Sequence, residues 1–248
     1  MNQPPHRVAL VTGSTSGIGA AIARRLARDG VTVALHSRVS VASGIALAEE
    51  LGRASYTQAD LSESTSAQRL IDEVRDKHGR LDILVNNAAM TQVIPHAELK
   101  SATADVWRRL YEVNVVTPWL LIAEAESMLR ESAQGGRPGC VVNISSHAGV
   151  RPKGASIPYA VSKAALNHMT KLLAVALAPE IRVNAVAPGL VDTPMTATWT
   201  DTHELWRTRA PMRRAAKPEE IADVVAMLIA SDYVTGEIIV ADGGLNLT

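Results

Sequence analysis

Short apolar runs alternate with longer segments of helical period along nearly the whole chain, and this alternation limits the fold more than any other feature. Each apolar run has the length of a strand, and most of the segments between them have the length of a helix. We therefore expect an α/β fold in which a doubly wound parallel sheet of about seven strands has helices on both faces. Strands are expected at 8–12, 31–37, 54–58, 81–86, 140–145, 181–187 and 237–241, and helices at 17–29, 41–51, 64–78, 103–132 in two pieces, 158–178 and from 218 onward.

Composition narrows the class of ligand. With 47% hydrophobic residues, the 248-residue chain can form one domain, 1–248, around a single core. The formal net charge is zero, so we expect a small-molecule ligand and neither nucleic acid nor a membrane as partner.

Residues 1–7 are polar and no long apolar run occurs, so neither a signal peptide nor a membrane span is expected. The lone Cys140 lies in an apolar run, which indicates a buried thiol and a cytoplasmic protein, and no metal site is expected.

A glycine-rich loop joins the first expected strand to the first helix. Its sequence is Thr12-Gly13-Ser14-Thr15-Ser16-Gly17-Ile18-Gly19. Glycines permit a tight turn and close approach of a ligand, while the free N–H groups and the dipole of a helix N-terminus favour an anion. Such a turn can also be purely structural, but its place in a strand–helix–strand unit favours binding of a dinucleotide pyrophosphate.

The end of the second expected strand bears on the choice of dinucleotide. An acidic residue there would hold the ribose hydroxyls of NAD, whereas this chain has Ser37-Arg38. A guanidinium beside a hydroxyl suits the 2′-phosphate of NADP. Arg38 could equally be a solvated surface residue, so NADP(H) is the favoured cofactor and NAD(H) the alternative.

Tyr159 and Lys163 are four residues apart in an expected helix, so their side chains lie on one face about one turn apart. A nearby ammonium favours the phenolate, which would bring the tyrosine pKa closer to neutrality for acid–base chemistry on a carbonyl or an alcohol. This spacing also arises by chance, so the neighbouring motifs matter. Ser145 and Ser146 end an apolar strand upstream, and Pro188-Gly189 forms a turn after a strand downstream.

Taken together and in this order, these motifs resemble the short-chain dehydrogenase/reductase family over nearly the whole chain. The resemblance implies a single Rossmann-type domain that transfers a hydride between NADP(H) and a carbonyl or secondary alcohol. The motifs that carry it are T-G-x-x-x-G-I-G at 12–19, Asn86-Asn87-Ala88, Asn114, Ser146, Tyr159-x-x-x-Lys163 and Pro188-Gly189-x-x-x-Thr193.

The resemblance also implies a role for each matching residue. Ser146 would polarise the carbonyl, Tyr159 would give or take its proton, Lys163 would lower the tyrosine pKa and bind the nicotinamide ribose, and Asn114 would hold a water for proton relay. Ser146 is preferred to Ser145 because Ser146 precedes the tyrosine by thirteen residues and has a glycine three residues later. The cofactor would contact Gly13, Thr15, Ser16, Gly17, Ile18, Gly19, Ser37, Arg38, Asp60, Leu61, Asn87, Ala88, Tyr159, Lys163, Pro188, Gly189, Val191 and Thr193.

Two positions depart from the family pattern. Ala89 stands where a glycine is common, and Ser16 stands where many NADP-dependent members have a basic residue, so Arg38 carries most of the cofactor prediction. His147 is expected to point away from Ser146 and is left out of the catalytic set.

Substrate specificity is expected from the loops. The walls should come from 91–96, 147–157 and a lid at about 191–214, where Trp199 and Trp206 either line the pocket or pack the lid onto the body. An acyl thioester, a free ketone, a sugar and a cyclic substrate all stay open. The family resemblance implies a homo-oligomer, a tetramer joined through helices near 114–128 and 158–178. A non-catalytic nucleotide sensor on the same fold is the alternative of another class.

Overall fold

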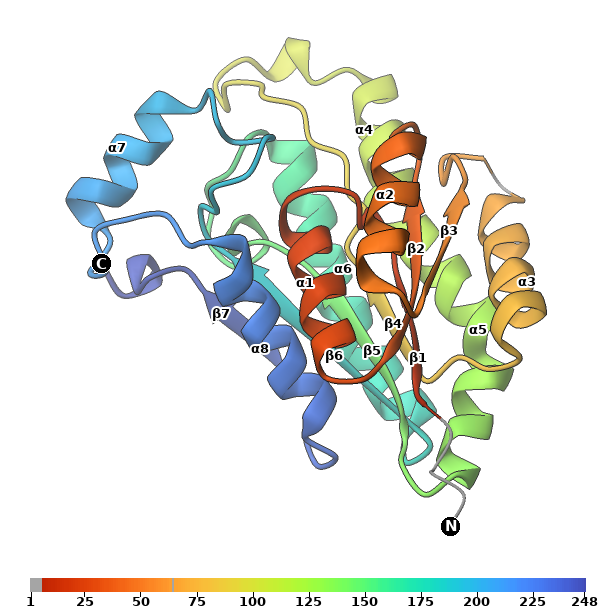
Figure 1. Cartoon of the computed structure of the whole chain (residues 1–248). Coiled ribbons are helices and arrows are strands. Elements are labelled where there is room, and N and C mark those ends of the chain that lie inside the picture. The colour runs from red at the N-terminus through yellow and green to blue at the C-terminus, as the bar shows by residue number, and fades with distance from the viewer. Residues whose placement is uncertain (1–5, 64) are drawn as a thin grey trace.

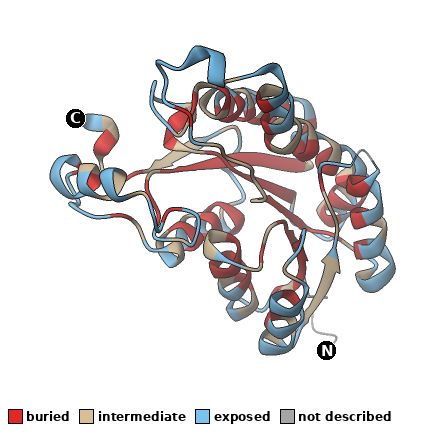
Figure 2. Cartoon of the chain, turned by 90° about the horizontal axis from the view of Figure 1, so that it is seen from above, coloured by how far each residue is buried: buried red, intermediate tan, exposed pale blue. Residues whose placement is uncertain are grey.

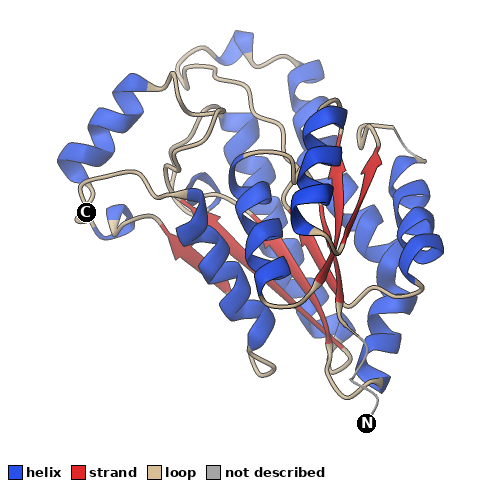
Figure 3. Ribbon diagram, viewed as in Figure 1, coloured by secondary structure: helices blue, strands red, loops and turns tan. Residues whose placement is uncertain are grey.

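A seven-stranded parallel sheet forms the centre of the molecule. The computed structural model describes residues 6–63 and 65–248, and the strands follow the order β3-β2-β1-β4-β5-β6-β7. Figure 1 and Figure 3 show the twisted sheet between its helices. The predicted α/β fold with about seven strands is confirmed. The strands are β1 Val8–Val11, β2 Thr32–Ser37, β3 Ala54–Gln58, β4 Ile83–Asn86, β5 Gly139–Ile144, β6 Ile181–Pro188 and β7 Ile238–Ala241.

Helices cover both faces of this sheet because the central strands are apolar on both sides. In β1, Ala9 and Val11 pack with α1, α2 and α8, whereas Val8 and Leu10 pack with α3, α5 and α6. Figure 2 shows the buried strands between helices whose outer faces are exposed. The helices are α1 Gly17–Arg28, α2 Val41–Leu51, α3 Ser66–His78, α4 Ala104–Tyr111, α5 Thr117–Gln134, α6 Ile157–Leu177, α7 Thr200–Arg209 and α8 Pro218–Ala230. No helix in the described ranges is long and apolar enough to cross a membrane.

The observed boundaries differ from the sequence prediction in detail. Most ends shift by one or two residues, and the first predicted residue of α3, Ser64, lies outside the described residues, as do residues 1–5 of the polar N-terminus. The predicted break within 103–132 is a π-helical turn, Glu112–Val116, which joins α4 to α5 without interrupting the helix. Pro118 lies in the first turn of α5, where proline is tolerated because its missing N–H would have no partner within the helix. Cys140 is buried as predicted.

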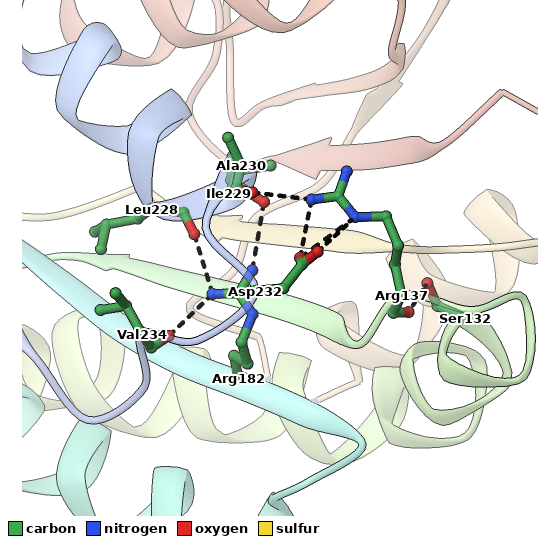
Figure 4. A network of polar contacts seen from close by, with 8 residues as sticks. All are labelled: Ser132, Arg137, Arg182, Leu228, Ile229, Ala230, Asp232 and Val234. Carbon is green, nitrogen blue, oxygen red and sulfur yellow. Dashed lines mark hydrogen bonds and ion pairs between the residues drawn. The ribbon is translucent and has the colours of Figure 1, made fainter.

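The C-terminal end of α8 is closed by two arginines from other elements (Figure 4). Arg182 of β6 donates to the carbonyl oxygens of Leu228 and Ile229, at 3.0 and 3.3 Å. Arg137 donates to the carbonyl of Ala230 at 3.0 Å. The Ser231 N–H bonds the carbonyl of Met227, so all four carbonyls of the last turn have donors without a glycine cap.

Candidate active site

A cavity of about 1830 Å³ opens where the carboxyl ends of the strands meet. In doubly wound sheets ligands bind at this edge, next to the point where the strand order reverses. Here the order reverses between β1 and β4, which are neighbours in the sheet. The volume exceeds that of an ordinary small-molecule pocket, which leaves room for a dinucleotide and a substrate together. Every predicted cofactor-binding residue lines this cavity: Gly13, Thr15, Ser16, Gly17, Ile18, Gly19, Ser37, Arg38, Asp60, Leu61, Asn87, Ala88, Tyr159, Lys163, Pro188, Gly189, Val191 and Thr193.

The glycine loop forms one end of the cavity. Gly13 and Gly17 have φ values of 61° and 51°, which favour glycine. A Cβ at Gly19 would overlap the carbonyl oxygen of Gly13, so only glycine permits this turn. Asn87 holds the loop from the end of β4, since its Nδ2 donates to the carbonyls of Thr12 and Gly13 at 2.8 and 3.0 Å. The N-terminus of α1 therefore faces a preformed cradle suited to a pyrophosphate.

The other end of the cofactor side of the cavity lies beside β2 and β3. The Ser37 hydroxyl is 2.8 Å from the hydroxyl of Tyr56, and Arg38 is exposed. The Arg38 guanidinium has no hydrogen bond or ion pair with residues 6–63 or 65–248. Ser62 donates to the Asp60 carboxylate through both its N–H and its hydroxyl, and these bonds lower the pKa of Asp60. A free guanidinium is thus available beside the cavity.

Ser146, Tyr159 and Lys163 come together from two elements. Ser146 follows β5, whereas Tyr159 and Lys163 lie one turn apart near the start of α6, whose N-cap is Ser156. A Cβ at Gly149 would lie 2.7 Å from the carbonyl carbon of Lys163, so glycine lets the turn after Ser146 pack directly on α6. Ser145 has the other orientation, because its buried hydroxyl donates to the carbonyl of Lys163 at 3.2 Å.

Burial sets the protonation of this cluster. It raises the pKa of Tyr159, and hydrogen bonding with Ser146 acts in the opposite direction. The Lys163 ammonium lies 5.9 Å from the centre of the Tyr159 ring and donates to the Ile144 carbonyl at 2.9 Å, while burial lowers its pKa to about 8. The predicted lowering of the Tyr159 pKa by Lys163 is therefore not what the structure indicates, because desolvation of the phenolate is the larger effect.

Asn114 lies behind the cavity wall, in the π-helical turn. Its side chain is 1% exposed, accepts from the Met90 N–H at 2.9 Å and donates to the Met90 carbonyl and the Ser162 hydroxyl, both at 3.0 Å. Three protein partners occupy the amide, so it braces the segment after β4 against α6. π-helical turns are frequent at functional sites, and the sequence pattern gave no sign of this one.

The lid packs onto the body through both tryptophans and lines the cavity at the same time. Trp206 of α7 is buried, Trp199 packs against the same apolar cluster, and both face the cavity. The His147 ring meets Trp206 edge-on at 6.0 Å, and its Nε2 lies 3.4 Å from Asp242 Oδ2. Burial lowers the pKa of His147, whereas Asp242 raises it. The three predicted wall segments all contribute lining residues.

Two residues that the sequence argument left aside also support the site. The Thr12 hydroxyl accepts from the N–H groups of Asn87 and Ala88 at 3.0 and 2.9 Å. The Nδ1 atom of His36 accepts a hydrogen bond from the Gly13 N–H of the glycine loop. Thr12 begins the glycine motif and His36 precedes Ser37-Arg38, so position along the sequence was the available signal. Ala89, the departure from glycine, lines the cavity without a positive φ.

The fold and the site define a class: α/β oxidoreductases that use a nicotinamide cofactor. A family profile described as "Enoyl-(Acyl carrier protein) reductase" matches residues 13–246. A Streptomyces violaceoruber protein whose name describes a ketoacyl reductase of the granaticin polyketide synthase is 45% identical over 98% of each chain. This chain belongs to the short-chain dehydrogenase/reductase family.

Solved structures agree with this membership. Pseudomonas aeruginosa RhlG in an active-site complex with NADP has a TM-score of 0.89 and 34% identity over 99% of each chain. A 3-ketoacyl-(acyl-carrier-protein) reductase of Brucella melitensis complexed with NADH has a TM-score of 0.89 and 31% identity over 98% of this chain and 99% of that one. Neighbours with either dinucleotide therefore share this fold.

Proposed function

We propose that this protein is an NADP(H)-dependent carbonyl reductase or secondary-alcohol dehydrogenase in which Tyr159 is the general acid and base. The observation that carries the proposal is that Ser146, Tyr159 and Lys163 meet in the same cavity as the glycine loop. A non-catalytic nucleotide sensor would have no use for this acid–base cluster.

The residues of the chain divide the reaction among them. When bound, the nicotinamide would supply or accept the hydride. The hydroxyls of Tyr159 and Ser146 would donate hydrogen bonds to the substrate carbonyl oxygen and hold the carbonyl carbon in place. Because burial raises the Tyr159 pKa, the phenol carries its proton at neutral pH and can deliver it to the oxygen as the alcohol forms. The Lys163 ammonium would then stabilise the resulting phenolate electrostatically.

For Asn114 we propose that the backbone, not the amide, serves the proton relay. The amide already has three protein partners. Pro118 lacks an N–H, so the Asn114 carbonyl has no donor four residues further on. That carbonyl is the group we assign to a relay water.

NADP(H) is the proposed cofactor because Arg38, directly after β2, has no partner in the described ranges and because no acidic residue stands at position 37 or 38. A 2′-phosphate would pair with this guanidinium. For the substrate we propose a ketone with apolar surroundings, since Val93, Ile94 and Met195 line the cavity beside the two tryptophans. The name of the Streptomyces relative makes ketoacyl compounds the first members of a test panel.

Titration of cofactor affinity tests the dinucleotide site before any substrate is known. We expect the wild-type protein to bind NADPH more tightly than NADH, with Arg38→Asp reversing the preference by losing about tenfold or more for NADPH. Arg28→Asp is the control, because this arginine at the C-terminal end of α1 does not line the cavity. Tighter binding of NADH by the wild type would contradict the NADP assignment.

Turnover of Tyr159→Phe tests the chemistry. The substitution removes only the proton-carrying hydroxyl, so we expect cofactor affinity within about twofold of wild type and a loss of turnover of about 10²-fold or more. Turnover equal to wild type in this variant would contradict the mechanism.

A further inference from the structure

His36, which precedes Ser37 in β2, lies below the glycine loop with both ring nitrogens engaged. The side chain is 2% exposed in total and reaches the cavity edge. The Gly13 N–H donates to its Nδ1 at 3.2 Å, and its Nε2 lies 3.0 Å from the Ala59 carbonyl oxygen. The ring thus joins the glycine loop, the end of β2 and the segment after β3, which are three parts of the cofactor side of the cavity.

These two partners determine the tautomer of His36. A backbone N–H can only donate, so Nδ1 must accept, and a carbonyl can only accept, so Nε2 must carry the hydrogen. The neutral ring satisfies both bonds. An imidazolium carries hydrogens on both nitrogens, so protonation would direct an N–H of the ring at the Gly13 N–H and break the bond that supports the loop.

Burial of the ring, and not the charges around it, favours the neutral form of His36. Burial lowers the pKa of His36, while the Ala59 bond and the Asp60 carboxylate after β3 raise it. Arg38 follows the last residue of the strand that holds His36, and the Tyr56 hydroxyl of β3 bonds Ser37. β1 and the glycine loop, 8–19, contain no titratable side chain. Asp60 is therefore the only acidic group that acts on the ring within the described ranges.

We propose that His36 is a positioning residue that holds the glycine loop in its dinucleotide-binding shape only while the imidazole is neutral. Protonation of His36 then weakens cofactor binding. This inference rests on the proposed function to the extent that the glycine loop holds the pyrophosphate. Simple attraction between an imidazolium and the cofactor phosphates predicts the opposite, tighter binding in acid, so the sign of the effect separates the two explanations.

Two substitutions separate the acceptor from the charge. His36→Asn keeps an acceptor oxygen near the Nδ1 position and does not titrate, whereas His36→Leu is apolar and leaves the Gly13 N–H without a partner. Near pH 8 we expect the dissociation constants of His36→Asn for NADPH and NADH to lie within about threefold of wild type, and those of His36→Leu to be about tenfold weaker.

The pH dependence is the decisive measurement. From about pH 8 to about pH 5 we expect the ratio of the wild-type dissociation constant to that of His36→Asn to rise about tenfold, because only wild type loses its acceptor. Titration of the cofactor phosphates cancels in this ratio. A ratio that stays constant or falls would overturn the proposal, as would equal binding by the Asn and Leu variants near pH 8.

Nitrogen NMR on the free protein tests the same inference without cofactor. We expect His36 to show hydrogen on Nε2 and the Gly13 amide resonance to shift with the titration of this histidine. Hydrogen on Nδ1, or a Gly13 amide resonance that does not shift during the titration of His36, would overturn the inference. Failure of both dinucleotides to bind would instead overturn the proposed function, while the NMR result would still decide the role of His36.

Discussion

At the scale of single residues, Lys163 shows how the site lowers the stability of the fold. Its side chain is 2% exposed, and burial lowers its pKa from 10.5 to about 8. A shift of that size corresponds to about 3 kcal/mol of lost stability at neutral pH. Lys163→Met removes this cost and loses the bond to the Ile144 carbonyl, worth about 1 kcal/mol. We expect Lys163→Met to raise the free energy of unfolding at pH 7 by about 2 kcal/mol, measured by urea denaturation.

The pH dependence checks the cause of this gain. Between about 8 and 10.5 the unfolded chain binds a proton that the folded wild type lacks, so wild-type stability rises with pH. The advantage of Lys163→Met should therefore shrink toward pH 10. Lys171→Met, an exposed position on the same helix, is the control and should change stability by less than about 0.5 kcal/mol. An advantage that stays constant with pH would assign the gain to packing.

Residue spacing predicted which residues meet in the site better than it predicted their pKa values. The four-residue interval between Tyr159 and Lys163 placed both on one helix face. The thirteen residues from Ser146 to Tyr159 selected Ser146 over Ser145; both serines line the cavity, but the Ser145 hydroxyl is bonded to the Lys163 carbonyl. The pKa of Tyr159 depends on what packs around it, which local spacing does not contain. The same holds for His36, whose partners are 23 residues away in both directions along the chain.

At the scale of elements, the end of α8 depends on Arg182. This side chain is 4% exposed and donates to Leu228, Ile229 and Val234. The Val234 carbonyl keeps a second donor, the side-chain amide of Asn184, so Arg182→Met leaves the carbonyls of Leu228 and Ile229 without a side-chain donor. Because each unsatisfied buried carbonyl costs about 1 kcal/mol or more, we expect a loss of about 2 kcal/mol in the free energy of unfolding. Arg137→Met is the matched control. Its pair with Asp232 is half-exposed and water can replace its bond to the carbonyl of the exposed Ala230, so its loss should stay below about 1 kcal/mol. Equal losses would contradict a special role for Arg182.

Hydrophobic period located the seven strands and every α-helix of the described residues except α7, which lies in the expected lid, but it did not show how the ends of the helices are satisfied. The π-helical turn at Glu112–Val116 continues the helix that was expected in two pieces over 103–132, and Pro118 does not interrupt it because proline in a first turn needs no N–H. The carbonyls of α8 find donors from β6 and from the residue that precedes β5 by two. Contacts between residues this far apart in sequence arise only once the sheet order is set.

At the scale of the whole molecule, the parallel sheet and its two helical layers follow from the pattern of the sequence, whereas the assembly does not. We propose that the outer faces of α5 and α6 join subunits into a tetramer. Val161, Leu172 and Val175 form one stripe along α6 and are 41%, 59% and 84% exposed, with Trp119 of α5 at 49%. Exposed apolar side chains grouped on one face mark an interaction surface.

Light scattering after chromatography tests this surface. We expect wild-type particles of four 26.4 kDa chains, and particles of two chains for Leu172→Glu, because a two-fold interface brings each glutamate near its symmetry mate in an apolar contact. Ile45→Glu on α2, at a position 48% exposed, carries the same charge away from the stripe and should leave the mass unchanged. A monomeric wild type, or a Leu172→Glu protein that keeps four chains, would show that α6 faces solvent and that its apolar stripe has no partner subunit.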